Sequence, residues 1–256
     1  MLPALVEPQR LGRWSGWGWA LGYAGGLACL TLALFAFIQA DDPWLGLDRS
    51  AAEHVRATFP LVAVWFLVFA LPLLLFTPDA PATGKGMRQA TRDGLKQLRD
   101  SIREVRRYMH LVRFLIARMV YIDGLGTLFV FGGVYAAGTF DMTEAQVLLF
   151  GIALNVTAGL GAAGFAWIDD WIGSRRTILL SLVGLIAFGT LILLVESQVA
   201  FWALGLALGI FVGPVQAASR SYLARAAPED LRNQMFGLYA LSGKATAFLG
   251  PLLVGW

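Results

Sequence analysis

The sequence predicts an all-α, polytopic membrane protein. Of its 256 residues, 57% are hydrophobic and only 14% are charged, whereas a soluble domain carries about 25% charged residues. Seven apolar stretches reach the roughly 20 residues that a helix needs to cross a bilayer. They lie at about 16–38, 59–76, 111–137, 147–168, 177–195, 200–220 and 235–256.

The first stretch is predicted to be a membrane helix rather than a cleaved signal peptide. Arg10 and Arg13 provide a basic flank, but the apolar run exceeds the usual signal core of about 7–15 residues, and six more spans follow it. Small residues let membrane helices approach closely. The glycine-rich run 159–164 in the fourth stretch is therefore expected to serve helix packing.

Composition argues against several classes of site. The single cysteine, Cys29, lies inside an apolar run, and the two histidines, His54 and His110, are far apart in sequence. These residues provide neither a disulfide framework nor a zinc-binding spacing. No cofactor, metal or nucleic-acid partner is expected. The spans are expected to be surrounded by membrane lipid.

The loops between the spans differ strongly in basic charge. Of the 20 Lys and Arg residues, only Arg49 and Arg56 fall on one side of the membrane when the spans alternate, and the other 18 fall on the other side. Because Lys and Arg concentrate in cytoplasmic loops, the N-terminus and residues 77–110 are predicted to be cytoplasmic. A bacterial-type inner or plasma membrane is the expected location.

The segment 77–110 is the longest loop and carries a helical pattern. Leu95, Leu98, Ile102, Val105 and Met109 recur at steps of three and four, with basic residues between them. The pattern predicts a basic amphipathic helix on the cytoplasmic membrane surface; a solvated helix against a partner is the alternative. The chain then divides into residues 1–76, 77–110 and 111–256.

A weak internal repeat indicates that the seven spans belong to a larger repeat. Three pairs align at an offset of 221: Leu2 with Leu223, Gly16 with Gly237, and Gly22 with Gly243. This offset covers six spans, so both copies enter the membrane from the same side, as a parallel two-halves transporter requires. A six-span repeat seen across seven spans leads us to expect that the chain is a fragment.

The loop after the fourth stretch resembles the signature of the major facilitator superfamily, Gly-x3-Asp-[Arg/Lys]-x-Gly-x-[Arg/Lys]-[Arg/Lys]. Asp170, Gly173, Arg175 and Arg176 match it, whereas Ala166 replaces the first glycine and Trp171 the first basic residue. The family carries this loop after its second and eighth spans. The long basic loop upstream implies the copy after span eight, so the chain would hold spans five to eleven, with the remaining N-terminal spans as its partner.

Further runs resemble the branch of that superfamily related to fungal vacuolar amino-acid effluxers. They are residues 18–26, Asp123-Gly124, 131–140, 213–220 and 239–247. The resemblance implies the major facilitator fold and a secondary active transporter, not an enzyme. Such a transporter works by alternating access, with a small solute such as an amino acid bound between two halves near mid-depth.

Asp123 and Lys244 are the strongest candidates for binding. An ionisable side chain deep in a bilayer is costly and is a functional candidate by default. Asp123 would bind substrate or couple protons, or else form a structural ion pair with Arg118 or Lys244. Lys244, about twelve residues into the last stretch, would bind a substrate carboxylate or pair with Asp123. Polar lining candidates are Asn155, Gln216, Tyr121 and Tyr239, each with an interhelical hydrogen bond as its structural alternative.

Asp170, Gly173, Arg175 and Arg176 are expected to gate rather than to bind substrate. The carboxylate of Asp170 would lie against the positive N-terminal end of the first span, near Ser15 and Gly16, with Arg220 as its partner. Such a contact would hold the cytoplasmic side closed. Three other classes stay open: a non-transporting truncated fragment, a membrane enzyme around Asp169 and Asp170, and a retinal protein with Lys244 and Asp123.

Overall fold

The computed structural model describes residues 6–40, 44–77, 86–89, 91–94, 96, 107–229 and 231–255. Within these residues seven helical segments are long and apolar enough to cross a membrane, and no strand occurs. The segments are Pro8–Ile38, Glu53–Phe76, Met109–Phe140, Ala145–Ile172, Ser174–Ile192, Gln198–Ala226 and Arg232–Gly255. The all-α membrane class and all seven predicted spans are thereby confirmed.

Several helices continue past the ends that hydropathy predicts. The helix α7, Glu144–Ile172, includes Asp169 and Asp170, and α9, Gln198–Ala226, runs six residues beyond Arg220. Backbone hydrogen bonding continues after the side chains turn polar, so composition marks the membrane boundary and not the helix end. The polar residues at these ends therefore lie on ordered helical turns.

The chain forms two compact units, one of residues 1–21 with 86–256 and one of residues 22–85. The helix α2, Leu11–Ala33, contributes its first part to the larger unit. The smaller unit continues with a π-helical turn at Leu34–Ile38, a short turn at Trp44–Gly46, α3 at Glu53–Arg56 and α4 at Thr58–Phe76. Hydrogen bonds from the side chain and backbone of Ser50 lower the pKa of Asp48 in its connecting loop.

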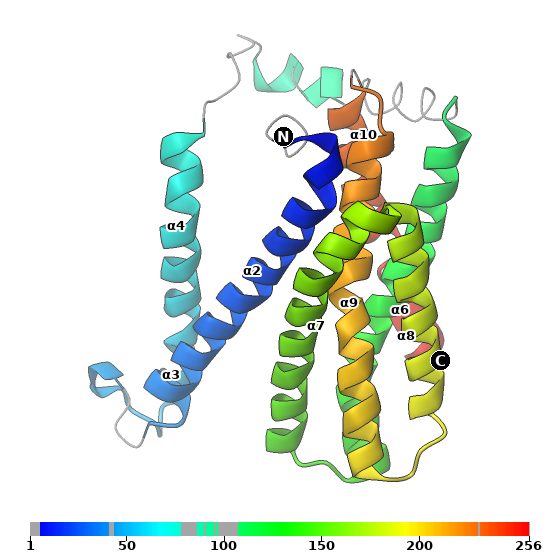
Figure 1. Ribbon diagram of the computed structural model, residues 1–256. Helices are drawn as coiled ribbons and strands as arrows, with labels where there is room; N and C mark the ends of the chain where they lie inside the picture. The colour runs from blue at the N-terminus through cyan, green and yellow to red at the C-terminus, as the bar shows by residue number, and fades with distance from the viewer. Residues whose placement is uncertain are drawn as a thin grey trace. The chain divides into compact units, whose positions relative to one another are not determined.

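In the larger unit, α9 packs against both α7 and α8, which spans Ser174–Ile192 (Figure 1). Glycines bring these backbones together: a Cβ on Gly161 of α7 would collide with the carbonyl oxygen of Ile210 in α9. A Cβ on Gly213 of α9 would likewise collide with the carbonyl oxygen of Ala158. The structure thus supports the packing role expected for the glycine-rich run in α7.

The connection between α7 and α8 is the single residue Gly173, which has φ +87°. Side-chain-bearing residues rarely adopt this conformation, so glycine permits the abrupt turn. The turn places the C-terminal end of α7 directly beside the first turn of α8.

The last span is broken into α10, Arg232–Ala245, and α11, Leu249–Gly255. Pro251 has no N–H to donate to Ala247, and its ring would clash with that carbonyl in a continuous helix. The break falls at residues 246–248, so Pro251 lies in the first turn of α11, where a helix tolerates proline. The break lies between Lys244 and Gly250, close to candidate residues of the predicted site.

The predicted amphipathic helix rests mainly on residues outside the described ones, namely Leu95, Leu98, Ile102 and Val105. The described residues 87–89, 91–94 and 96 are helical, and Met109 begins α6, Met109–Phe140. The surface helix and the three-part division of the chain stay predictions.

Candidate functional site

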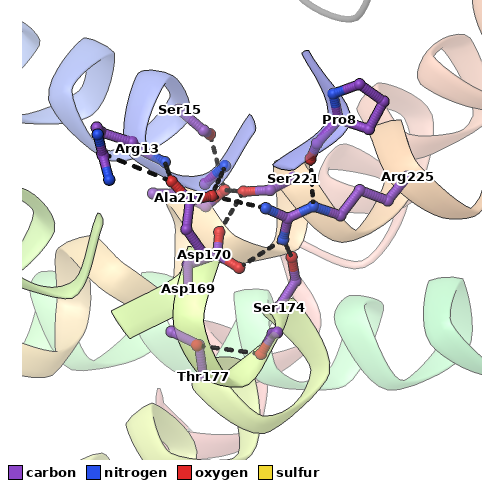
Figure 2. Close-up of polar contacts among 12 residues, drawn as sticks. Pro8, Arg13, Ser15, Asp169, Asp170, Ser174, Thr177, Ala217, Ser221 and Arg225 are labelled. Carbon is purple, nitrogen blue, oxygen red and sulfur yellow. Dashed lines mark hydrogen bonds and ion pairs between the residues drawn. The ribbon is translucent and has the colours of Figure 1, made fainter. Parts of the chain in front are cut away.

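Two adjacent carboxylates at the end of α7 share one arginine from α9 (Figure 2). Arg225 donates from one terminal nitrogen to Asp169 Oδ1 at 2.9 Å and from the other to Asp170 Oδ1 at 2.8 Å. The same guanidinium donates to the Ser174 hydroxyl of α8 and, through Nε, to the carbonyl oxygen of Pro8 at 3.2 Å. We call Asp169, Asp170, Ser174, Ser221 and Arg225 the carboxylate cluster.

Asp169 is the buried member of the carboxylate cluster, with 3% of its side chain exposed. Its second oxygen accepts a hydrogen bond of 2.6 Å from the Ser221 hydroxyl of α9. A buried carboxylate is tolerated when a cation and hydrogen-bond donors compensate its charge. Arg225 and Ser221 provide that compensation.

Asp170 lies against the beginning of α2. It accepts hydrogen bonds from the backbone N–H of Gly12 at 2.8 Å and of Arg13 at 3.1 Å, and the Arg13 side chain lies 3.7 Å away. The first N–H groups of a helix lack partners within the helix and carry partial positive charge. The structure thus places Asp170 at the expected helix end, at Gly12 and Arg13 rather than at Ser15 and Gly16.

Close packing of α2 on α7 depends on glycine. A Cβ on Gly12 would come within 2.6 Å of the Asp169 carboxyl carbon, and one on Gly16 within 2.6 Å of the Ala166 Cβ. Ala166 stands where the superfamily signature has its first glycine. In this chain the space for the close approach is provided by Gly16 on the opposite helix.

Arg220 is not the partner of Asp170 in the structure, contrary to the expectation. It donates to the Ser15 hydroxyl at 3.1 Å and to the Ser15 carbonyl oxygen at 3.2 Å, and Ser15 in turn donates to the carbonyl oxygen of Ala217. Arg225, five residues further along α9, reaches the carboxylates because it lies at the level of the α7–α8 turn. Arg220 therefore makes a second contact between α9 and α2.

Arg175 and Arg176 follow the turn but do not join the carboxylate cluster. Both side chains are exposed, and neither forms an ion pair among the described residues. Of the four signature residues, Asp170 belongs to the carboxylate cluster and Gly173 forms the turn between α7 and α8.

A second polar region lies deeper, where α6 meets the break between α10 and α11. A Cβ on Gly250 would come within 3.0 Å of Asp123 Oδ2 and would collide with the Thr127 hydroxyl. The other carboxylate oxygen of Asp123 is buried and has no hydrogen-bond partner among the described residues. An unpaired carboxylate oxygen in a membrane span is costly, which makes Asp123 a candidate for binding a ligand or a proton.

Arg118 is held by α10 and not by Asp123. It donates to the Tyr239 carbonyl oxygen at 2.8 Å and to the Ser242 hydroxyl at 2.9 Å, and its guanidinium lies 3.6 Å from the centre of the Tyr239 ring. Lys244 is exposed. No ion pair joins Asp123 to Arg118 or Lys244 in the described part of the chain, so the structural alternative for Asp123 is not observed.

The remaining lining candidates bond mostly within their own helices. Asn155 donates to the Gly151 carbonyl oxygen at 2.8 Å and Gln216 to that of Val212 at 3.3 Å. Only Tyr121 makes the expected bond between helices, to Ser219 of α9. Asn155 also lines a largely apolar cavity of about 390 Å³ among α6, α7, α8 and α9.

Sequence reasoning missed Arg225 as a functional residue and treated Asp169 only as part of a possible enzyme site. Two signals could have found them. Adjacent carboxylates at a helix end require a cation, and Ser221 and Arg225 are four residues apart, on one face of a helix.

The contacts define a polytopic membrane protein in which the C-terminal ends of α7 and α9 hold the N-terminal end of α2. The chain belongs to the family described as vacuole effluxer Atg22 like, which it matches over residues 6–256. The predicted resemblance is confirmed. Because this is a family of effluxers, the expectation of a transporter rather than an enzyme is confirmed at the level of the family.

The similar proteins carry transporter and autophagy names. The chain is 24% identical over 250 residues to an uncharacterized MFS-type transporter, YxiO, of Bacillus subtilis, covering 97% of this chain and 58% of the relative. It is 23% identical over 275 residues to autophagy-related protein 22 of Yarrowia lipolytica, covering 95% and 45% respectively. The chain thus spans about half the length of the relatives it matches. No solved structure matches it.

Proposed function

We propose that the chain works as part of an alternating-access transporter for a small solute, with the carboxylate cluster as its gate. The observation that carries this proposal is Asp170, which binds Arg225 of α9 and the backbone of Gly12 and Arg13 in α2 at once. Opening this contact would separate α2 from α7 and α9. The contact consists of two backbone hydrogen bonds and two ion pairs, from Arg225 and Arg13, and such polar contacts can break and reform.

The charge pattern supports a cytoplasmic position for this gate. The carboxylate cluster lies at the α7–α8 connection, on the side to which alternation of the spans assigns 18 of the 20 basic residues. Under the positive-inside rule this side faces the cytoplasm. The described arrangement would then be closed inside, and release of Asp170 would open it inward.

The solute site of the proposal is the region around Asp123. Transporters bind their solutes near the midplane, where broken helices expose backbone groups. Asp123 lies beside such a break and has a free carboxylate oxygen, with Tyr239 and Lys244 on the same broken span. An amino acid fits this set because the carboxylate of Asp123 can accept hydrogen bonds from its ammonium group, and the ammonium group of Lys244 can donate hydrogen bonds to its carboxylate. Proton coupling would use the same Asp123 oxygen.

Asp170→Asn tests the gate. An amide cannot hold both the helix end and Arg225 as a carboxylate does, so the inward-open population should rise. In a Cys29→Ser background, a Ser15→Cys probe, which is fully buried between α2 and α9 in the described arrangement, should react with a membrane-impermeant maleimide several-fold faster on the cytoplasmic side. The matched control is Asp141→Asn at the α6–α7 connection, where φ is 50° and asparagine is well tolerated. Equal reactivity in both variants would contradict the gate.

Asp123→Asn tests the solute site separately. In vesicles reconstituted with the protein, uptake of radiolabelled amino acids should fall at least tenfold, because the amide removes the charge that binds the ammonium group or the proton. The Ser15→Cys reactivity should stay at the Asp141→Asn level. Full uptake by Asp123→Asn would exclude a required carboxylate and leave the gate untouched.

A further inference from the structure

A second pocket at the same end of the larger unit lies outside the carboxylate cluster. It measures about 400 Å³ and opens between α6, α8 and α9. Arg113, near the start of α6, and Arg175, in the first turn of α8, are its cationic residues, and His110 also lines it. None of the residues that line it is acidic.

The two arginines have no ion-pair partner in the described part of the chain. His110, Arg113 and Arg175 are exposed. Both helices also begin without a side-chain cap, at Tyr108 and at Gly173, so their first N–H groups add positive potential. The site therefore repels cations and favours an anion.

The rest of the pocket is aromatic and aliphatic, and Tyr121 and Tyr222 carry its only other polar side-chain atoms. Phe114 and Ala117 of α6 face Ile178, Leu179 and Leu182 of α8 across it. Leu179 is 53% exposed, and Ile186, two helical turns further along the same helix, is 68% exposed. A ligand that fits would carry its charge at the helix ends and a hydrocarbon chain along α8.

We propose that this pocket binds one anionic phospholipid, with its phosphate held by Arg113 and Arg175 and an acyl chain along Leu179 and Leu182. Basic pockets between membrane helices on the cytoplasmic side are suited to lipid head groups. A soluble phosphate would leave the apolar wall unused. This proposal goes beyond the transport function and is independent of the transported solute.

Native mass spectrometry of the purified chain in detergent tests the lipid site. Phosphatidylglycerol should bind at least tenfold more tightly than phosphatidylcholine of the same chains. One basic residue near an anionic surface contributes about 1 kcal/mol, or about fivefold in affinity. Arg113→Gln and Arg175→Gln should each weaken phosphatidylglycerol binding by about that factor, and the double variant by roughly 25-fold. If the double variant does not fold, the two single variants carry the test.

Arg176→Gln is the matched control, because Arg176 is adjacent, exposed and equally charged but does not line the pocket. It should bind phosphatidylglycerol like the parent chain. Equal affinity for the two lipids, unchanged binding in the Arg113 and Arg175 variants, or equal loss in Arg176→Gln would overturn the proposal. Displacement of the lipid by equimolar glycerol phosphate would also overturn it, in favour of a soluble anion.

Discussion

At the scale of single residues, Arg225 has the largest expected effect on stability. It neutralises Asp169, which has 3% of its side chain exposed, together with Asp170. Removing one partner of a buried ion pair costs about 3–5 kcal/mol because a charge is left uncompensated. Since 24% of the Arg225 side chain is exposed, we expect Arg225→Gln to lower the free energy of unfolding by about 3 kcal/mol. Unfolding in detergent mixtures, followed by circular dichroism, measures it.

Two companion variants make this expectation specific. Adding Asp169→Asn to Arg225→Gln should recover part of the loss, because the more deeply buried of the two carboxylates is then neutral, while Asp170 keeps Arg13 and the N–H groups of α2. Arg176→Gln removes an exposed, unpaired arginine, and such changes usually stay within about 0.5 kcal/mol. A double variant no more stable than Arg225→Gln would show that Arg225 acts through packing instead.

The local sequence was enough to predict the position of Asp170, whereas its partner on α9 could be identified only from the fold. Asp170 was predicted at the N-terminal end of the first span because the superfamily signature names it and helix ends attract carboxylates. Its partner was predicted as Arg220, whereas the structure shows Arg225. The choice between two basic residues five positions apart on one helix depends on the depth at which α9 passes α7. The spacing of residues in the sequence does not reveal that depth.

At the scale of elements, α7 and α9 offer a direct test of glycine packing. Gly161 touches the backbone of Ile210, whereas Gly164, on the same helix, has open space where a Cβ would be. Filling a tight contact costs about 1–3 kcal/mol, and alanine in a helix is otherwise favoured over glycine by about 0.5–1 kcal/mol. Gly161→Ala should therefore destabilise the protein and Gly164→Ala should not, as thermal unfolding in detergent would report. Equal effects of the two would indicate that the contact is loose.

The elements themselves were largely predictable, because apolar length decides which segments cross a bilayer. All seven predicted spans are helical. The break between α10 and α11 comes just before Gly250-Pro251, a pair of the kind that kinks or weakens helices. Hydropathy averages over such a break, since residues 246–248 include apolar side chains. Its consequence for Asp123 appears only when α6 and α11 are in contact.

At the scale of the whole molecule, the distribution of basic residues predicts the orientation of the chain in the membrane. Ser50, in the loop of the smaller unit, and Thr91, in the segment before α6, should face opposite sides. In a Cys29→Ser background we expect an impermeant maleimide to label Ser50→Cys in intact cells and Thr91→Cys only after permeabilisation. Each variant serves as the control for the other. The reverse labelling pattern would invert the topology and place the carboxylate cluster outside.

The hydrogen bonds between Asp170 and α2 have a consequence for how their partners can evolve. The two donors are backbone N–H groups, and only glycine at position 12 leaves room for the carboxylates. Substitutions at position 13 leave its donor in place, because every residue except proline offers the same N–H. Positions 13 and 170 should therefore show only weak pairwise covariation among relatives, because the contact between their side chains is a 3.7 Å ion pair with the Arg13 side chain 44% exposed, and exposed pairs contribute little.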